Sequence, residues 1–282
     1  MNESHIQSTV LTNSYRIVEK YVKEIAHNPS EYNKELIEIL DKVIDEDFDN
    51  FLMDIPKQIF RARVVKHPIR EDERFEELEY SGYNDDNSRE APLTKSEAGR
   101  NSIKGQAYFY GASDKETACA EIKPKLDELI SVAEFEMSPS LRIIDFCRDR
   151  VINNAEKSIN VPLVITEVMA MFCLPVERQD DYLASQILAE HIRKTGVDGI
   201  SYRSAYTNGT NYTIFNCNKN NLKFMKSWMV VNRNIEYTFM DIENKNVFKT
   251  ANIYKSEYSE EIREYLARKP GMQNSAFVRR KF

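Results

Sequence analysis

The N-terminal part of the chain carries hydrophobic side chains at helical spacing. Two series of apolar residues recur with a period of about 3.6 residues, one within residues 15–25 and one within residues 36–44. Asn28-Pro29-Ser30 lies between them, and a proline at this place favours a break between two helices. Residues 14–52 are therefore expected to form two helices, either packed on the rest of the chain or acting as a separate module or lid.

Beyond residue 55 the pattern changes to the alternation of apolar and polar residues that is typical of half-buried strands, most clearly at 59–65. Further strands are expected at 108–110, 132–137, 141–146, 200–203, 212–217 and 222–228, with weaker alternation over 230–258. Asn208-Gly209 is expected to form a tight turn before the strand at 212–217. Helices are expected at about 148–158, 162–173, 180–194 and 260–268, and the acidic segment 70–98 is expected to be a long loop. The fold class predicted is α+β, with a mixed, mostly antiparallel sheet and flanking helices.

The stretch from residue 99 to residue 121 holds an unusual number of special residues. Its first part is a glycine-flanked loop that carries Arg100, Asn101 and Lys104 and that Gly105 closes. The aromatic strand Tyr108-Phe109-Tyr110 follows this loop.

The second part of this stretch is predicted to be a short helix. Ser113 is the expected N-cap, with Glu116 completing a capping box, and Pro124 ends the helix. Glu121 then lies near the helix end, beside small residues. Because the turn between strand and helix is short, the loop cation, the strand aromatic and this carboxylate are expected to face one cleft.

Charge and composition exclude several classes of function. The net charge of −6 gives no general attraction to nucleic acid or anionic lipid, and the basic residues 279–281 are interpreted as a solvated tail. No secretory signal is visible, and the most apolar run, 159–176, is too mixed to span a bilayer, so a cytoplasmic protein is expected. The cysteines and histidines show no metal-binding spacing, so no metal site is expected; these residues are Cys119, Cys147, Cys173, Cys217, His5, His27, His67 and His191.

Each candidate side chain also has an ordinary structural interpretation. Arg61 and Arg100 suit a phosphorylated ligand, although composition alone favours ordinary surface arginines. Glu121 either stabilises developing positive charge, binds ribose hydroxyls or forms a structural salt bridge. Tyr110 either stacks on a ligand ring or belongs to the core, and Ser204 in isolation is only a polar residue at a strand end.

Two further patterns bear on nucleotide or nucleic-acid chemistry. The chain has no Walker loop and no GxGxxG motif, so a nucleotide would be held by side chains. Arg61 and His67 have the spacing of the all-helical HEPN ribonucleases, but here the spacing runs along a predicted strand that is followed by His67-Pro68, and the missing helical context disfavours that interpretation.

Taken in order, the motifs resemble the RES domain family, which is named for an arginine, a glutamate and a serine. The resemblance covers roughly residues 55–220. It rests on Phe60-Arg61-Ala62-Arg63, Gly99-Arg100-Asn101, Tyr108-Phe109-Tyr110, Glu116-Thr117-Ala118 with Glu121, and Asp198-Gly199-Ile200 with Tyr202-Arg203-Ser204. The chain departs from the family pattern at Ser102, where proline is frequent, and in the long acidic insertion before Gly99.

The resemblance implies a fold related to ADP-ribosyltransferases, with NAD bound in a cleft of the sheet. Many family members are toxins of bacterial toxin–antitoxin pairs that degrade NAD with inorganic phosphate to nicotinamide and ADP-ribose-1-phosphate. The alternatives are a protein ADP-ribosyltransferase, an NAD hydrolase and a non-catalytic nucleotide-binding module. NAD is thus the expected substrate and phosphate the co-substrate, without a prosthetic group, and a cognate antitoxin and a homo-oligomer are the partners considered.

The resemblance also assigns roles to residues and regions. Glu121, Arg61 and Ser204 are expected to be catalytic, while Arg100, Tyr110 and Asn101 are expected to bind substrate. The expected regions are an N-terminal helical extension at 1–54, the RES domain at 55–230 and a C-terminal extension at 231–282 that packs on it.

Overall fold

The computed structural model describes residues 17–29, 34–46, 51–65, 82–147, 168–173, 182–233, 235–240 and 247–252. The helical segments are 17–27, α2 (Glu35–Glu46), α4 (Asp85–Ser88), the 3-10 helix η2 (Leu93–Lys95), α5 (Lys115–Glu121), 168–173 and α8 (Leu183–Lys194). The strands are β1 (Gln58–Val64), β2 (Phe109–Ala112), β3 (Leu129–Met137), β4 (Ile143–Asp145), β5 (Gly199–Arg203), β6 (Thr210–Ile214), β7 (Leu222–Val231), β8 (Ile235–Met240) and β9 (Val247–Asn252). His67 and the helices expected at 148–158 and 260–268 lie outside the described residues.

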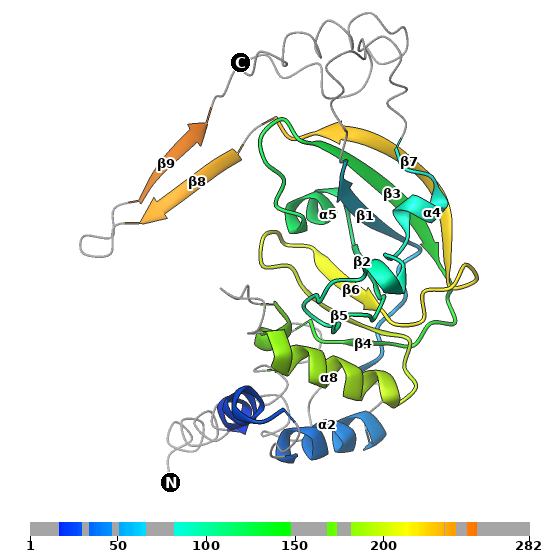
Figure 1. The fold of residues 1–282 in the computed structure, drawn as a ribbon, viewed down its shortest axis with the longest axis vertical. Helices are drawn as coiled ribbons and strands as arrows, with labels where there is room; N and C mark the ends of the chain where they lie inside the picture. Colours follow the sequence, from blue (N-terminus) through cyan, green and yellow to red (C-terminus); the bar gives the residue numbers. More distant parts are fainter. Residues whose placement is uncertain are drawn as a thin grey trace, which may run out of the picture.

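Seven strands form one sheet in the order β4-β5-β6-β2-β1-β3-β7 (Figure 1). The β4–β5 pair is parallel and all other pairs in this sheet are antiparallel. The α+β class with a mixed, mostly antiparallel sheet is therefore confirmed. No described helix is long and apolar enough to cross a membrane.

The sheet is weakest at its centre, between β1 and β2. These strands pair at one position, Phe60 opposite Ala112, whereas β1 and β3 pair along the whole of β1. Since the two strands share a single pairing position, their side chains are free to line an opening between them. This opening positions the site described below.

Both faces of the sheet centre are covered, because alternate residues of β1 enter different apolar clusters. Ile59 belongs to a cluster with Phe109 and Phe135, and Ala62 belongs to one with Ala118 of α5. Small residues at the contact let α5 approach the sheet closely. The helix that carries Glu121 is thereby held over β1.

The N-terminal helices share a third cluster with α8 and with strands β4 and β5. The hydroxyl of Tyr21 donates to the carbonyl oxygen of Ala184 at 3.2 Å, and His191 Nε2 lies 2.6 Å from Asp41 Oδ1 of α2. Figure 1 shows α2 alongside α8, at the β4 side of the sheet, and the β8–β9 ribbon projecting away from it. The division into regions 1–54, 55–230 and 231–282 stays a prediction.

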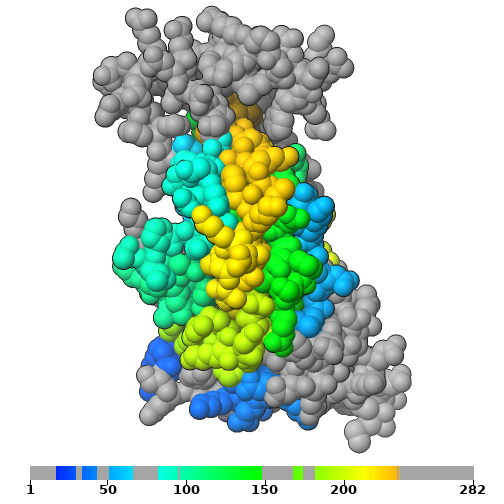
Figure 2. All heavy atoms as spheres, turned by 90° about the vertical axis from the view of Figure 1, so that its right-hand side faces the viewer, coloured from blue at the N-terminus to red at the C-terminus, as the bar shows by residue number. Residues whose placement is uncertain are grey.

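The acidic segment was expected to be a long loop, but its described part contains two short helices, α4 and η2. Asn84 caps α4, its side chain accepting the N–H of Asn87. The segment is tied to the sheet: Ser227 of β7 donates to the carbonyl oxygen of Tyr83 at 2.6 Å, and Arg89 donates to that of Leu222 at 2.7 Å. Figure 2 shows this segment (cyan) packed beside β7 (yellow to orange).

Candidate active site

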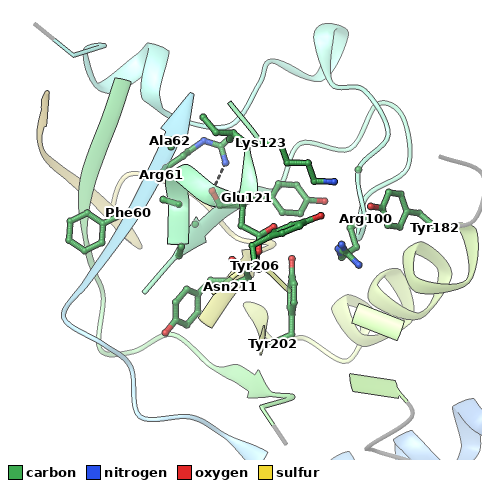
Figure 3. A pocket seen from close by; sticks show the side chains of 17 residues that line it. Phe60, Arg61, Ala62, Arg100, Glu121, Lys123, Tyr182, Tyr202, Tyr206 and Asn211 are labelled. Carbon is green, nitrogen blue, oxygen red and sulfur yellow. Dashed lines mark hydrogen bonds between the residues drawn. The ribbon is translucent and has the colours of Figure 1, made fainter. Parts of the chain in front are cut away.

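A cavity of about 330 Å³ opens between β1 and β2, beneath the C-terminal end of α5 (Figure 3). Its lining comprises Phe60, Arg61, Ala62, Gly99, Arg100, Tyr110, Gly111, Ala112, Ala118, Glu121, Ile122, Lys123, Tyr182, Tyr202, Tyr206, Asn211 and Tyr212. Four of the six residues predicted from sequence are in this set. The other two, Ser204 and Asn101, lie behind the lining residues and contact them.

Glu121 is the last residue of α5, and two side chains from the neighbouring hairpin hold its carboxylate. Ser204 Oγ donates to Oε1 at 2.7 Å, and Asn211 Nδ2 donates to the same oxygen at 2.6 Å. Oε2 has no hydrogen bond to any residue that the structure describes. Glu121 therefore has one anchored oxygen and one oxygen available to a ligand in the cavity.

The hydroxyl group of Ser204 is fully used inside the protein. It lies just after β5 and donates its proton to Glu121, while its oxygen accepts the backbone N–H groups of Tyr206 at 3.0 Å and Thr207 at 3.3 Å. Ser204 is also buried. The resemblance assigned Ser204 a catalytic role, whereas in this structure its hydroxyl supports the carboxylate of Glu121.

Arg61 extends from β1 into the opening between the strands. Nη1 donates to the carbonyl oxygen of Tyr110 at 2.5 Å, and the guanidinium lies 5.0 Å from the ring centre of Phe109. Its buried Nε has no hydrogen-bond partner within the described ranges. Burial and, second, the like charge of Arg63 lower the pKa of Arg61 to about 9, so the guanidinium remains charged at neutral pH. A cation with a buried, unused N–H favours an anionic ligand.

Arg100 approaches from the loop between η2 and β2, so the two arginines flank Glu121 from different elements (Figure 3). Its guanidinium lies over the ring of Tyr182, 5.0 Å from the ring centre. Its carbonyl oxygen accepts the hydroxyl of Ser185 at 2.6 Å. The side chain and the backbone of Arg100 thus both contact residues at the N-terminal end of α8.

Tyr110 and Asn101 support the loop of Arg100 from below. The hydroxyl of Tyr110 donates to Ser102 Oγ at 2.8 Å and accepts the N–H of Asn101 at 3.3 Å. Burial raises the pKa of Tyr110, so it stays a neutral phenol. The side chain of Asn101 is fully buried and donates to Thr213 at 2.8 Å. Tyr110 belongs to the cavity lining, whereas Asn101 is absent from it.

The sequence reasoning missed two polar residues of the site, Lys123 and Asn211. Lys123 follows α5 in a left-handed conformation, with a φ of 48°, and its Nζ lies 5.1 Å from the ring centre of Tyr206. A hydrogen bond with the Tyr206 hydroxyl raises the pKa of Lys123. The spacing of Asn211 from the predicted Asn208-Gly209 turn was the available signal, since it placed Asn211 beside the end of the preceding strand.

Two local predictions near the site are wrong. Asp114, not Ser113, is the N-cap of α5, because the Ser113 hydroxyl accepts the N–H of Thr210 and is used in tying β2 to β6. Gly209 lacks the positive φ of a tight primed turn. It is needed because a Cβ at this position would lie 2.0 Å from Thr117 Oγ1 on α5.

The charges and rings around the cavity define the ligand that fits it. Arg61, Arg100 and Lys123 supply three cations around one carboxylate, Glu121, and tyrosine rings supply flat apolar surface. Cations and rings together suit a phosphorylated compound that carries a planar base. No group of three or more potential metal ligands occurs in the described part of the chain.

Comparison with known proteins gives one match to a family. The model described as the RES domain matches residues 74–237, which is more than half of the chain and includes Arg100, Tyr110, Glu121 and Ser204. Arg61 precedes the matched range. No curated protein matches the chain. A chain of the crystal structure of the M. tuberculosis MbcT–MbcA toxin–antitoxin complex is similar at 8% identity and a TM-score of 0.42, covering 70% of this chain and 93% of that chain.

Proposed function

The chain belongs to the RES domain family, and on that premise we propose that it cleaves the bond between nicotinamide and ribose in NAD. The observation that carries the proposal is Glu121: one oxygen is anchored by Ser204 and Asn211, and the other is left for a ligand among three cations. A fixed carboxylate beside cations that neutralise phosphates is the arrangement this reaction requires.

In the proposed reaction the carbon–nitrogen bond breaks and its electron pair leaves with nicotinamide, which departs as a neutral molecule. No general acid is therefore obligatory. The ribose carbon develops positive charge, and the Glu121 carboxylate stabilises it electrostatically. Ser204 and Asn211 act as positioning residues, because their hydrogen bonds fix the direction in which the carboxylate faces.

The cations would hold the anionic part of the substrate. Arg61 has an unused N–H and a pKa lowered to about 9 by burial, so a phosphate group would supply the counter-charge that it lacks. Arg100 and Lys123 lie on the same cavity and would bind the second phosphate or the incoming anion. The tyrosine rings would pack on the bases.

For the acceptor, we propose inorganic phosphate, which attacks the ribose carbon through one oxygen and gives ADP-ribose-1-phosphate. Guanidinium and ammonium groups bind phosphate oxygens, and the three cations that line the cavity, Arg61, Arg100 and Lys123, favour an anionic co-substrate over water. The family resemblance extends the proposal to a bacterial toxin or defence effector that a cognate antitoxin or another regulator restrains.

The test is incubation of the purified chain with NAD, with and without phosphate, followed by chromatography and mass analysis. Phosphate-dependent release of nicotinamide with ADP-ribose-1-phosphate is expected. Release that ignores phosphate would replace phosphorolysis by hydrolysis, or by protein ADP-ribosylation if a protein gains the mass of ADP-ribose. Folded protein that consumes no NAD would overturn the enzyme proposal in favour of a nucleotide-binding module.

A further inference from the structure

Helix α8 has a polar buried stripe that the proposed chemistry does not use. Most of its buried residues, such as Leu188 and Ile192, enter the apolar cluster shared with the N-terminal helices. Ser185 and Gln186 are buried too, at 2% and 5% exposure, and are polar. Buried polar side chains are retained where they make specific hydrogen bonds.

Both side chains hydrogen-bond to the backbone of the loop that carries Arg100. Ser185 Oγ donates to the carbonyl oxygen of Arg100 at 2.6 Å, and Gln186 Nε2 donates to that of Gly99 at 2.7 Å. These carbonyl oxygens belong to a segment that is part of no helix or strand. Hydrogen bonds from side chains of α8 therefore hold this segment, as backbone hydrogen bonds between neighbours hold a strand.

The same helix also holds the far end of this segment. Glu190 Oε2 accepts Gln106 Nε2 at 3.0 Å and the hydroxyl of Tyr108 at 3.1 Å. Arg193 fixes Glu190 through two hydrogen bonds of 2.8 Å. The loop is therefore bound to α8 on both sides of its exposed tip, where Ile103 and Lys104 lie.

The side chain and the backbone of Arg100 contact the same end of α8. Its guanidinium lies over Tyr182, which directly precedes α8, while Ser185 and Gln186 occupy the first turn of the helix. This turn of α8 therefore contributes to the position of both the backbone and the guanidinium of Arg100 at the cavity. A shift of the loop would move the cation away from a bound anion.

We propose that Ser185 and Gln186 are positioning residues, which place Arg100 for an anionic substrate without touching that substrate. The inference rests on the proposed function for its kinetic consequence, but the mechanical link between α8 and the loop stands apart from it. Two tasks are thereby divided between two parts of the site. Glu121, Ser204 and Asn211 govern the chemical step, whereas the first turn of α8 governs substrate affinity through Arg100.

The experiment compares the full chain with Gln186→Met, which has similar length but cannot donate a hydrogen bond. Loss of one buried hydrogen bond should raise KM for NAD by about fivefold to tenfold, while kcat changes less than about twofold. Hydrogen exchange measured by mass spectrometry should become faster in peptides that cover 99–106. His191→Gln is the matched control, because it changes the face of α8 that contacts Asp41 and should leave both readouts unchanged.

A double-mutant cycle decides whether Gln186 acts through Arg100. In an Arg100→Met background, Gln186→Met should add no further rise in KM, and a fully additive rise would overturn the proposal. Ser185→Ala is the second variant if Gln186→Met does not fold, with the same expected directions. If the wild type consumes no NAD, the proposed function fails, but unchanged exchange at 99–106 in a folded variant would still refute the link to α8.

Discussion

Arg61 and Arg100 reach the same cavity from backbones that are fixed in different ways. Arg61 lies in β1, whose seven residues all pair with β3. Arg100 lies in a loop whose carbonyl oxygens are held by side chains of α8. The first position is set by sheet register and the second by the side chains of another element.

The two arginines also differ in what their charge costs the fold. Arg61 is drawn into the opening of the sheet, where burial and the nearby Arg63 lower its pKa and its Nε lacks a partner in the described structure. Arg100 stacks on a ring at the cavity wall. Arg61 is therefore expected to lower the stability of the fold, whereas Arg100 is expected to have almost no effect on it.

The largest contrast is expected from Arg61→Met. Removal of a buried, poorly paired charge by a side chain of similar length should leave Tm unchanged or higher. The affinity for NAD should fall by about 100-fold, because a buried charge-assisted contact is lost. Calorimetric titration and thermal unfolding measure the two effects.

Arg63→Met is the control for this change, since Arg63 lies on the same strand and outside the cavity lining. It should bind NAD nearly as the wild type does. A clear fall in Tm for Arg61→Met, with NAD affinity retained, would show that Arg61 has a structural role instead.

Arg100→Met should raise KM for NAD by about tenfold, because it removes a cation that, under the proposed function, binds an anionic group of the substrate at the cavity wall. Tm should change by less than about 2 °C, since the side chain packs at the surface of one ring. Steady-state kinetics with a melting curve are sufficient. A loss of stability larger than that of Arg61→Met would reverse the comparison.

Asn211→Ala tests a residue that hydrogen-bonds to Glu121, the carboxylate that lies between the two arginines. Glu121 would keep Ser204 and lose its 2.6 Å bond from Asn211. We expect kcat to fall by about tenfold with little change in KM, because the carboxylate is less well oriented for the transition state. A change confined to KM would assign Asn211 to substrate binding.

The smallest effect is a pH dependence of the link between α8 and the Arg100 loop. Hydrogen bonds, chiefly from Arg193 and then Tyr108, lower the pKa of Glu190 to about 2 from 4.5. The contribution of Glu190 to stability is therefore complete above about pH 4.5 and is lost as the pH falls toward about 2. Between about pH 5 and about pH 2.5, Tm of the wild type should fall more steeply than Tm of Glu190→Gln. Parallel slopes would contradict the assignment.

Local sequence patterns predicted most of the described elements, although not α4 or η2, and together with the family resemblance they pointed to four of the residues that line the cavity. Alternation at 59–65 located β1 with Arg61, and helix signals located α5 with Glu121. The N-cap was displaced by one residue because the pairing of β2 with β6 uses the Ser113 hydroxyl, which no local pattern encodes.

Contacts between distant elements could not be predicted in this way. Asn211 reaches Glu121 because of the pairing of β5 with β6, and Ser204 is turned toward the same oxygen by its own bonds to the following turn. From the sequence, Gln186 is only one residue within the helix expected at 180–194. Its role depends on a loop that lies 87 residues earlier in the chain.

The most direct test of the central claim is nicotinamide release from NAD by the wild type and Glu121→Gln, measured side by side. Glutamine keeps the shape of the side chain and an acceptor for Ser204 and Asn211 but removes the charge. We expect the variant to bind NAD, to melt at the wild-type Tm, and to release nicotinamide slower by about 100-fold to 1,000-fold or more. A folded Glu121→Gln variant that releases nicotinamide at the wild-type rate would contradict the assignment of Glu121 and, with it, the proposed active site.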